Sequence, residues 1–257
     1  MKQLTSYIAS LFILISCHTN DDTIIKTHFS EIDFSFLSDT SKKLSSSKNI
    51  KEPSIAKNTN LGILSITENG NYTTTEPTFF NKTYPLELNL KLSLHNVNHL
   101  PYEVTSYHQK NVSDTSYQVV KESTFYPSHL LCIQNLSQED IGIKQQDNQV
   151  FLIQEAKNED GEWKNIEYFD YSKCGNSYWI TALRAHQMML VQIPKYKGNF
   201  DTFLRVKLKV NNQLFYSDSI QCTIQKSQFD LSPQSSDYRR LRRKFTAPKV
   251  DSLIYFL

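Results

Sequence analysis

An alternation of leucine with polar residues in residues 86–94 constrains the fold of this chain more than any other feature. Five leucines occupy every second position, and Glu87, Asn89, Lys91 and Ser93 fill the positions between them. Successive side chains of a β-strand point to opposite faces, so this spacing places all five leucines on one face. On a helix, at about 100° per residue, they would scatter around the circumference. The pattern therefore predicts a strand that buries one face.

Further strand-like runs predict an all-β, antiparallel sandwich or barrel. The runs lie at 117–125, 129–135, 149–156, 163–169, 178–183, 188–193, 202–210 and 213–224. Their spacing of about 8 to 12 residues is typical of sandwiches and barrels. The sequences at 159–161 and 210–213 have the turn residues of hairpins. A long helical period is not evident after residue 17, and residues 137–141 fit one helical turn at most.

Composition argues against nucleotide and nucleic-acid chemistry. The chain has six glycines and neither a G-x-G-x-x-G nor a Walker-type phosphate loop. Residues 17–232 carry 21 lysines and arginines against 24 aspartates and glutamates, which gives no broad electrostatic basis for holding a nucleic acid. We therefore predict no cofactor and no nucleic-acid partner.

The first 16 residues have the organisation of an export signal. Lys2 supplies a positive charge, and residues 8–15 form an apolar run. A run of this length is too short to cross about 30 Å of hydrocarbon as a helix, whereas signal peptides have apolar regions of about 7 to 15 residues. We therefore expect export from the cytoplasm.

The residues Leu14-Ile15-Ser16-Cys17 resemble the lipobox of bacterial lipoproteins. The resemblance implies that residues 1–16 are removed and that Cys17 is lipidated. It also implies a membrane-anchored lipoprotein of the cell envelope, in the outer membrane or facing the periplasm. The alternative is an ordinary secretory signal followed by an incidental cysteine.

The rest of the chain divides by composition. We expect a flexible tether at 17–60, a hairpin within 61–83, a sandwich domain at 84–232 and a basic tail at 233–257. The tail holds six of the 28 lysines and arginines. A solvated extension, a contact with anionic lipid head groups and a contact with acidic glycan all remain open for it. Its apolar end, 250–257, is expected to dock as a strand.

The C-terminal half resembles bacterial immunoglobulin-like sandwich domains. The resemblance rests on Trp163, residues 198–200, residues 202–206 and the pair Tyr216-Ser217. It implies an immunoglobulin-like sandwich. The intervals from Cys132 to Trp163 and from Trp163 to Cys174 depart from the Cys…Trp…Cys framework of true immunoglobulin domains, which leaves the topology open.

Three cysteines remain once Cys17 is assigned to the anchor. Cys132 and Cys222 lie in apolar, strand-like stretches, where packing as small hydrophobic residues explains them. Cys174 lies in a polar turn. In an oxidising compartment these three allow at most one disulfide, and the absence of a C-x₂-C pair argues against zinc.

Three groups of residues offer catalytic or metal chemistry, each with a simpler explanation. His95, His99 and His108 lie close together in the sequence, although no H-E-x-x-H motif accompanies them. Cys174 and His186 supply a nucleophile and a base without a recognisable signature around either. The carboxylates available for glycoside hydrolysis mostly lie beside turn residues, namely Glu139, Asp140, Glu155, Glu159, Asp160 and Glu167.

Aromatic residues offer a binding surface instead. Tyr168, Tyr171, Tyr178 and Trp179 flank the loop around Cys174 and form a predicted binding edge, with strand packing as the competing explanation. We therefore predict a lipid-anchored binding or structural module without catalysis. Its predicted partners are the membrane, through Cys17, and an envelope protein or glycan. An envelope hydrolase that uses Cys174 or the His95/His99/His108 group, and a protease-inhibitor-like module, are the alternatives.

Overall fold

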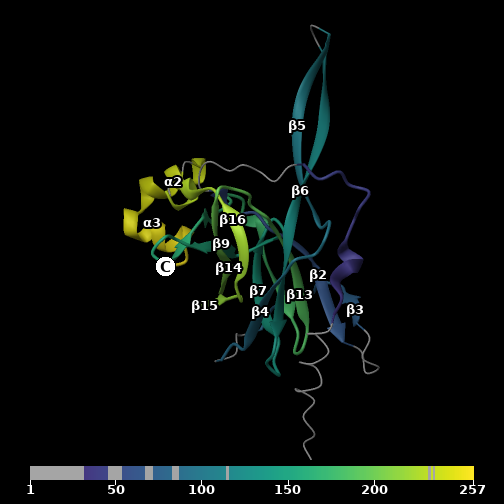
Figure 1. Ribbon diagram of the computed structural model, residues 1–257, viewed down its shortest axis with the longest axis vertical. Helices are drawn as coiled ribbons and strands as arrows, with labels where there is room; N and C mark the ends of the chain where they lie inside the picture. The colour runs from purple at the N-terminus through teal and green to yellow at the C-terminus, as the bar shows by residue number, and fades with distance from the viewer. Residues whose placement is uncertain are drawn as a thin grey trace, which may run out of the picture. The chain divides into compact units, whose positions relative to one another are not determined.

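The computed structural model describes residues 32–45, 54–66, 72–82, 87–113, 116–230, 233 and 235–257 (Figure 1). The leader, the lipobox with Cys17 and the first part of the predicted tether lie outside these residues. The elements below belong to a unit that spans Asp33–Leu257. Within the described part of the chain, no helix is both long and apolar enough to span a membrane.

The unit is an all-β sandwich, as the alternating pattern predicts. Its first sheet has the strand order β3-β2-β13-β6-β4, and β5 pairs with β6 as well. All of these pairs are antiparallel. The strands are β2 (Thr59–Ile66), β3 (Tyr72–Thr75), β4 (Leu90–His95), β5 (Pro101–Ser113), β6 (Ser116–Asn135) and β13 (Met188–Pro194).

The opposite layer is built from two further sheets. The second sheet is β10-β9-β14-β15, with β16 on another part of β14, and the third sheet is β12-β7-β8. The strands are β7 (Ile141–Gln146), β8 (Gln149–Val150), β9 (Leu152–Lys157), β10 (Trp163–Asn165), β12 (Tyr178–Leu183), β14 (Phe200–Val210), β15 (Gln213–Tyr216) and β16 (Ile220–Ile224). Only Phe151 separates β8 from β9, so the chain passes directly from the third sheet into the second. A short parallel pair joins β1 (Ser54–Ile55) to β11 (Glu167–Tyr168).

The core lies between the two layers. Leu92 and Leu94 of β4 are each 6% exposed and belong to one apolar cluster with residues of both layers. Their polar neighbours on β4 are more exposed, which confirms the one-sided strand predicted from the leucine alternation. Burying one such side chain stabilises a fold by about 1.5–3 kcal/mol. The cluster includes Leu131, Ile133, Ile143, Met189, Val191, Leu204, Val206 and Leu208.

Both predicted hairpin turns are present. The turn at 159–161 joins β9 to β10, and Gly161 has a φ of +79°, which favours glycine. Val210 pairs with Gln213 across the β14–β15 turn, where Asn211 has a φ of +54°. Residues 137–141 do not form the helical turn suggested by the sequence, because β7 begins at Ile141.

The strand β6 is one continuous element of 20 residues, although the sequence pattern divides it in two. From Ser128 onward it pairs with β13 in the first sheet, and from Leu130 onward it pairs with β4 as well. From Ser116 to Pro127 its partner strand is β5, and the two strands form an arm that extends from the sandwich (Figure 1). The side chains of residues 105–110 are largely exposed there, so no apolar face marks β5 in the sequence.

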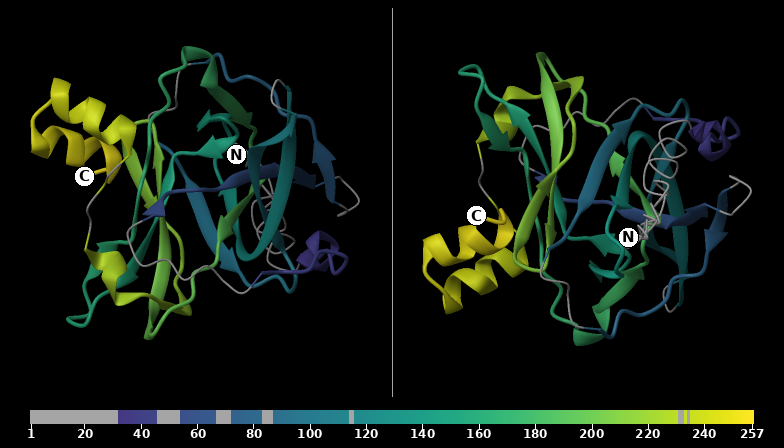
Figure 2. Two further views of the ribbon diagram at one scale, coloured as in Figure 1. Left: turned by 90° about the horizontal axis from the view of Figure 1, so that it is seen from above. Right: turned by 90° about the horizontal axis from the view of Figure 1, so that it is seen from below.

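Three regions outside the predicted sandwich at 84–232 also belong to the folded unit. The predicted hairpin segment, 61–83, supplies most of β2 and all of β3, which pair with each other in the first sheet. Ala56 and Asn58 are buried, so the C-terminal end of the predicted tether packs on the body. The basic tail forms the helices α2 (Ser236–Lys244) and α3 (Ala247–Ile254), shown side by side in Figure 2. The apolar end therefore docks as a helix and not as the predicted strand, because Val250 and Ile254 share one buried face at a spacing of four residues.

Candidate functional site

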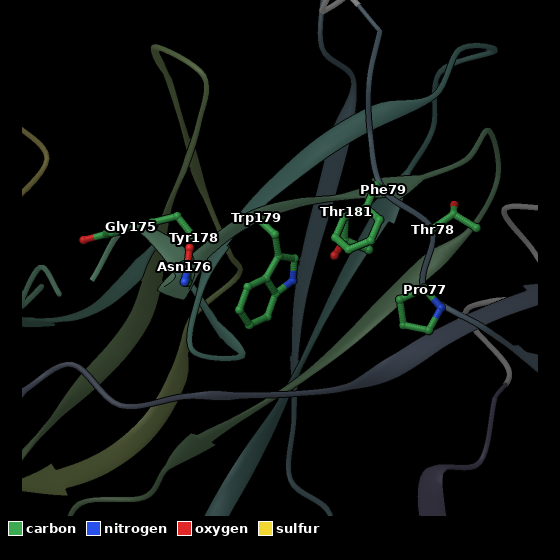
Figure 3. Close-up of a pocket in the computed structure, with 8 residues that line it drawn as sticks. All are labelled: Pro77, Thr78, Phe79, Gly175, Asn176, Tyr178, Trp179 and Thr181. Carbon is green, nitrogen blue, oxygen red and sulfur yellow. The ribbon is translucent and has the colours of Figure 1, made fainter. Parts of the chain in front are cut away.

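A pocket of about 440 Å³ lies beside β12, at the edge of the third sheet. Two segments that are about a hundred residues apart in the sequence line it, one before β4 and one around the start of β12. The lining residues are Pro77, Thr78, Phe79, Gly175, Asn176, Tyr178, Trp179 and Thr181 (Figure 3).

The first wall of the pocket is held by main-chain pairing. The backbone N–H of Phe80 donates to the Ile180 carbonyl at 2.8 Å, and the N–H of Ala182 donates to the Thr78 carbonyl at 2.7 Å. Phe79 forms an antiparallel bridge with Thr181 between these two bonds. Residues 78–80 therefore act as an added edge strand on β12.

Alternation along this edge sends neighbouring aromatic rings to opposite sides. The ring of Phe80 packs on the backbone of Gly142, where an added Cβ would lie only 2.5 Å from a ring carbon. The ring of Phe79 remains 80% exposed at the rim of the pocket. Figure 3 shows the indole of Trp179 projecting between the 77–79 segment and the turn at 175–176.

The second wall is fixed by a set of hydrogen bonds to the turn before β12. The Gln146 side chain accepts from the backbone N–H of Ser172 at 2.9 Å and donates to the Asp170 carbonyl at 2.9 Å. The hydroxyl of Tyr178 donates to the Ser172 carbonyl at 2.8 Å, and burial raises the pKa of this hydroxyl. The residues Gly175–Ser177 form a single 3₁₀ turn in this wall.

The lining of the pocket suits binding better than catalysis. Among the described residues that line it there is no carboxylate, imidazole, amine or thiol. Aromatic rings, the Thr78 hydroxyl and the Asn176 amide can stack on a ligand and form hydrogen bonds with it. General acid–base catalysis needs a group that gains or loses a proton near the working pH, and this lining offers none.

The structure divides the predicted binding edge into two parts. Tyr178 and Trp179 line the pocket. Tyr168 is buried against the C-terminal helices, and Tyr171 donates its hydroxyl hydrogen to the Leu253 carbonyl at 3.2 Å. The sequence analysis did not predict Phe79 as a pocket residue. The only local signal for it is the adjacent aromatic pair, Phe79 and Phe80, in a polar stretch.

The structure does not bring Cys174 and His186 together. Cys174 precedes β12 and His186 follows it, so the six residues of the strand, about 20 Å long, separate them. His186 Nε2 lies 3.1 Å from the Gln138 side-chain oxygen. A nucleophile and base on these two residues would need hydrogen-bond contact, so the Cys174–His186 interpretation is wrong.

The cysteines form no disulfide among Cys132, Cys174 and Cys222. Cys132 is buried in β6, and burial raises the pKa of its thiol. Burial also raises the pKa of Cys222 to about 11. Both lie in strands, as the sequence predicts, with Cys132 buried and Cys222 partly buried, whereas Cys174 is exposed beside the pocket turn.

The three candidate histidines do not form one site. His95 pairs with Leu130 and His108 with Val120, ten residues apart on β6, a separation of about 33 Å along an extended strand. His99 lies in the turn between β4 and β5, with a φ of +52°. No group of three metal-ligating residues is close enough to hold an ion anywhere in the described ranges.

The candidate carboxylates lie away from the pocket. Glu155 and Glu167 are buried in polar networks, and Asp140 pairs with Lys82 at 2.8 Å. Glu139 precedes β7 at the surface. None of them lines the aromatic pocket.

Glu159 and Asp160 do line another pocket, of about 410 Å³, together with Asp230. Glu159 is paired with Lys226 at 2.6 Å in an exposed position. The general acid of a glycosidase needs a carboxyl group shielded from water and from cations. Glu159, Asp160 and Asp230 are all exposed to water, and Glu159 also contacts a lysine, so none of them meets this condition and the pocket does not support glycoside hydrolysis.

The chain matches no family model, no curated protein and no solved structure. The immunoglobulin-like resemblance therefore stays a prediction.

Proposed function

We propose that the protein is a lipid-anchored component of the bacterial cell envelope whose sandwich binds a neutral saccharide in the pocket between Phe79 and Trp179. One observation carries the proposal. The phenyl ring of Phe79 is 80% exposed, although the backbone on both sides of it is paired with β12. A ring held in water by a fixed backbone is available to a ligand without rearrangement.

The chemistry of the lining favours a saccharide. A sugar ring presents an apolar C–H face, which stacks on an aromatic ring, and hydroxyl groups around its edge. Phe79 and Trp179 supply the aromatic surfaces, while Thr78 and Asn176 supply neutral polar groups. A charged ligand would find no side chain of opposite charge in this lining.

Absence of catalysis is part of the proposal. It is supported by the separation of Cys174 from His186 and by the separation of His95 from His108. The hydrolase alternative would need one of these groups to assemble beside a pocket. A turnover assay on any saccharide that binds tests this part directly.

The anchor rests on the lipobox and is tested separately. We expect labelled fatty acid to enter the wild-type protein, and Cys17→Ser to abolish both the label and the membrane association. A variant that remains equally membrane-bound would contradict the anchor.

The pocket is tested with a panel of neutral oligosaccharides of glucose, mannose and N-acetylglucosamine, by calorimetric titration. We expect Phe79→Ala and Trp179→Ala each to weaken binding by about tenfold, as the loss of one stacked ring implies. Tyr107→Ala, which removes an exposed ring on the β5–β6 arm, is the matched control. Equal losses in all three variants, or no binding to any member of the panel, would contradict the proposal.

A further inference from the structure

The C-terminal helices carry a cluster of cations around an exposed aromatic ring. We call this cluster, made of Arg242, Arg243, Lys244, Phe245 and Lys249, the cationic tip. All five residues are exposed, and Phe245 is 44% exposed. No aspartate or glutamate occurs between residues 238 and 250.

The helical hairpin is attached to the body at the ends opposite the tip. At the start of α2, the Ser235 hydroxyl donates to the Asp170 carboxylate at 2.7 Å. At the end of α3, the Phe169 N–H donates to the Ile254 carbonyl at 2.9 Å. The connection between the helices therefore lies away from the body, and both views of Figure 2 show the hairpin projecting from the sheets.

The aromatic ring at the tip has a fixed backbone. Phe245 is the C-cap of α2, and its N–H donates to the Leu241 carbonyl at 2.9 Å. Leu241, Val250 and Ile254 are buried between the helices and Tyr168. The packing of this small core leaves Phe245 outside it, among the cations.

The charge of the tip is not neutralised by any acidic group in the described part of the chain. Arg240, one turn earlier, pairs with Asp237 at 3.1 Å and so belongs to the base of the hairpin. Within the described residues, the four cations of the tip have no acidic partner at salt-bridge distance. The body carries a small excess of acidic residues, so the positive charge is local to this hairpin.

We propose that the cationic tip binds the anionic phospholipid head groups of the membrane, with Phe245 inserted at the interface. The inference rests on the proposed function, because the lipid anchor places the protein at such a surface. Clusters of at least four lysines and arginines are attracted to anionic bilayers, and an apolar side chain among them adds burial at the head-group boundary. Since the acyl chains alone would retain the protein, the tip would orient the sandwich on the membrane.

The aromatic ring distinguishes a bilayer from a soluble polyanion. A polyanion would need only the four positive charges, and truncation of Phe245 would leave its affinity unchanged. At a bilayer interface, burial of the ring strengthens binding in addition to the attraction between the cations and the anionic head groups. The proposal therefore requires both features to contribute.

The test uses a chain that begins at residue 17 and carries Cys17→Ser, which retains the whole unit Asp33–Leu257 and removes the anchor. We expect it to cosediment with vesicles of phosphatidylcholine and phosphatidylglycerol but not with phosphatidylcholine alone, and to dissociate at about 1 M salt. Arg242→Gln with Arg243→Gln should weaken binding by at least about tenfold. Phe245→Ala should weaken it several-fold.

Lys57→Gln with Lys110→Gln removes two exposed charges elsewhere and is the matched control. Thermal unfolding of each variant checks that the hairpin is still folded. Equal binding to both kinds of vesicle, or an equal loss in the control, would overturn the proposal. Binding to heparin that Phe245→Ala leaves unchanged, without vesicle binding, would assign the tip to a soluble polyanion. Because this chain lacks the acylated cysteine, a failure here is distinct from a failure of the anchor.

Discussion

The phenolic hydroxyl of Tyr196 donates a hydrogen bond to the carboxyl group of Glu167, which has no exposed surface. Gln154 donates two more, from its backbone N–H at 2.8 Å and from its side-chain amide at 2.9 Å. Burial opposes ionisation more strongly than these bonds favour it, and raises the pKa of Glu167 to about 7. Between about pH 4.5 and 7, the folded protein therefore keeps the carboxyl proton of Glu167, which an unfolded glutamate has already lost.

The first prediction is that this proton makes stability fall as the pH rises. The folded pKa of Glu167 lies above the ordinary value of 4.5, so its contribution is complete below pH 4.5 and lost as the pH rises to about 7. The shift corresponds to about 3 kcal/mol. Glu167→Gln removes the titration, so the free energy of unfolding of the wild type relative to the variant should fall by about that amount between pH 4.5 and 8.

Urea unfolding across this pH range measures the difference. Glu87→Gln, at an exposed glutamate, is the control and should leave the pH dependence unchanged. A Glu167→Gln variant with the same pH dependence as the wild type would show that Glu167 is ionised in the folded protein.

The second prediction concerns His129, whose buried ring has the opposite effect. Burial lowers the pKa of His129 to about 4, and the positive charge of Lys195 is a smaller cause in the same direction. Nδ1 lies 3.1 Å from the Asn96 side-chain oxygen, and Nε2 has no hydrogen-bond partner among the described residues. An imidazolium here would leave one N–H unsatisfied, so the folded state resists protonation.

Because the folded pKa of His129 is depressed, its contribution to stability is complete above pH 6.5 and is lost as the pH falls through about 4. Relative to His129→Gln, the wild type should lose about 3 kcal/mol of unfolding free energy between pH 7 and 4. The effects of Glu167 and His129 oppose each other between pH 4.5 and 6.5. Each is therefore measured as a difference between the wild type and its own variant, and a constant difference over the range would contradict the assignment.

The strands were predictable wherever one face is buried and the other solvated. Leu92 and Leu94 show this pattern directly. The same reasoning fails for β5, because most of its arm has solvent on both faces and burial imposes no period on its side chains. It also fails for α3, because its eight residues are about two helical turns and too few to show a sustained helical period.

The pocket was predictable only in part, for a different reason. Tyr178 and Trp179 are noticeable in the sequence because they stand beside a polar turn, and both line the pocket. Phe79 contributes through its bridge to Thr181, about a hundred residues away. Pairing between such distant segments depends on the whole sandwich, and no local pattern around Phe79 specifies it.

The third prediction tests whether Phe80 positions the pocket wall. An added Cβ at Gly142 would lie 2.5 Å from the ring of Phe80 and 2.7 Å from the Ile180 side chain. Gly142→Ala should therefore displace residues 78–80, cost about 1–3 kcal/mol of unfolding free energy and weaken saccharide binding. Gly175→Ala is the control for stability alone, since no atom lies within 4 Å of its added Cβ but the residue itself lines the pocket. If both variants unfold at the same urea concentration as the wild type, Phe80 does not fix this wall.

The last prediction concerns Arg205, which lies between two aromatic rings on the outer face of the second sheet. Its guanidinium carbon is 4.3 Å from the ring centroid of Trp163 and 4.1 Å from that of Tyr216. Its Nε and Nη2 lie 2.9 Å and 2.8 Å from one oxygen of Glu155, and Lys207 pairs with the other oxygen at 2.7 Å. The planar guanidinium thus contacts the rings of Trp163 and Tyr216 and, at the same time, the nearly buried carboxylate of Glu155.

Arg205→Lys keeps the charge but cannot stack on both rings while it contacts Glu155 through two nitrogens. We expect it to lower the free energy of unfolding by about 1–2 kcal/mol. Arg205→Ala should cost about 3 kcal/mol, because Glu155 then stays buried with Lys207 as its one remaining cation. Urea unfolding measures both, and Arg184→Lys, at an exposed arginine, is the control. An Arg205→Lys variant as stable as the wild type would mean that charge alone matters at this position and that the stacking contributes nothing.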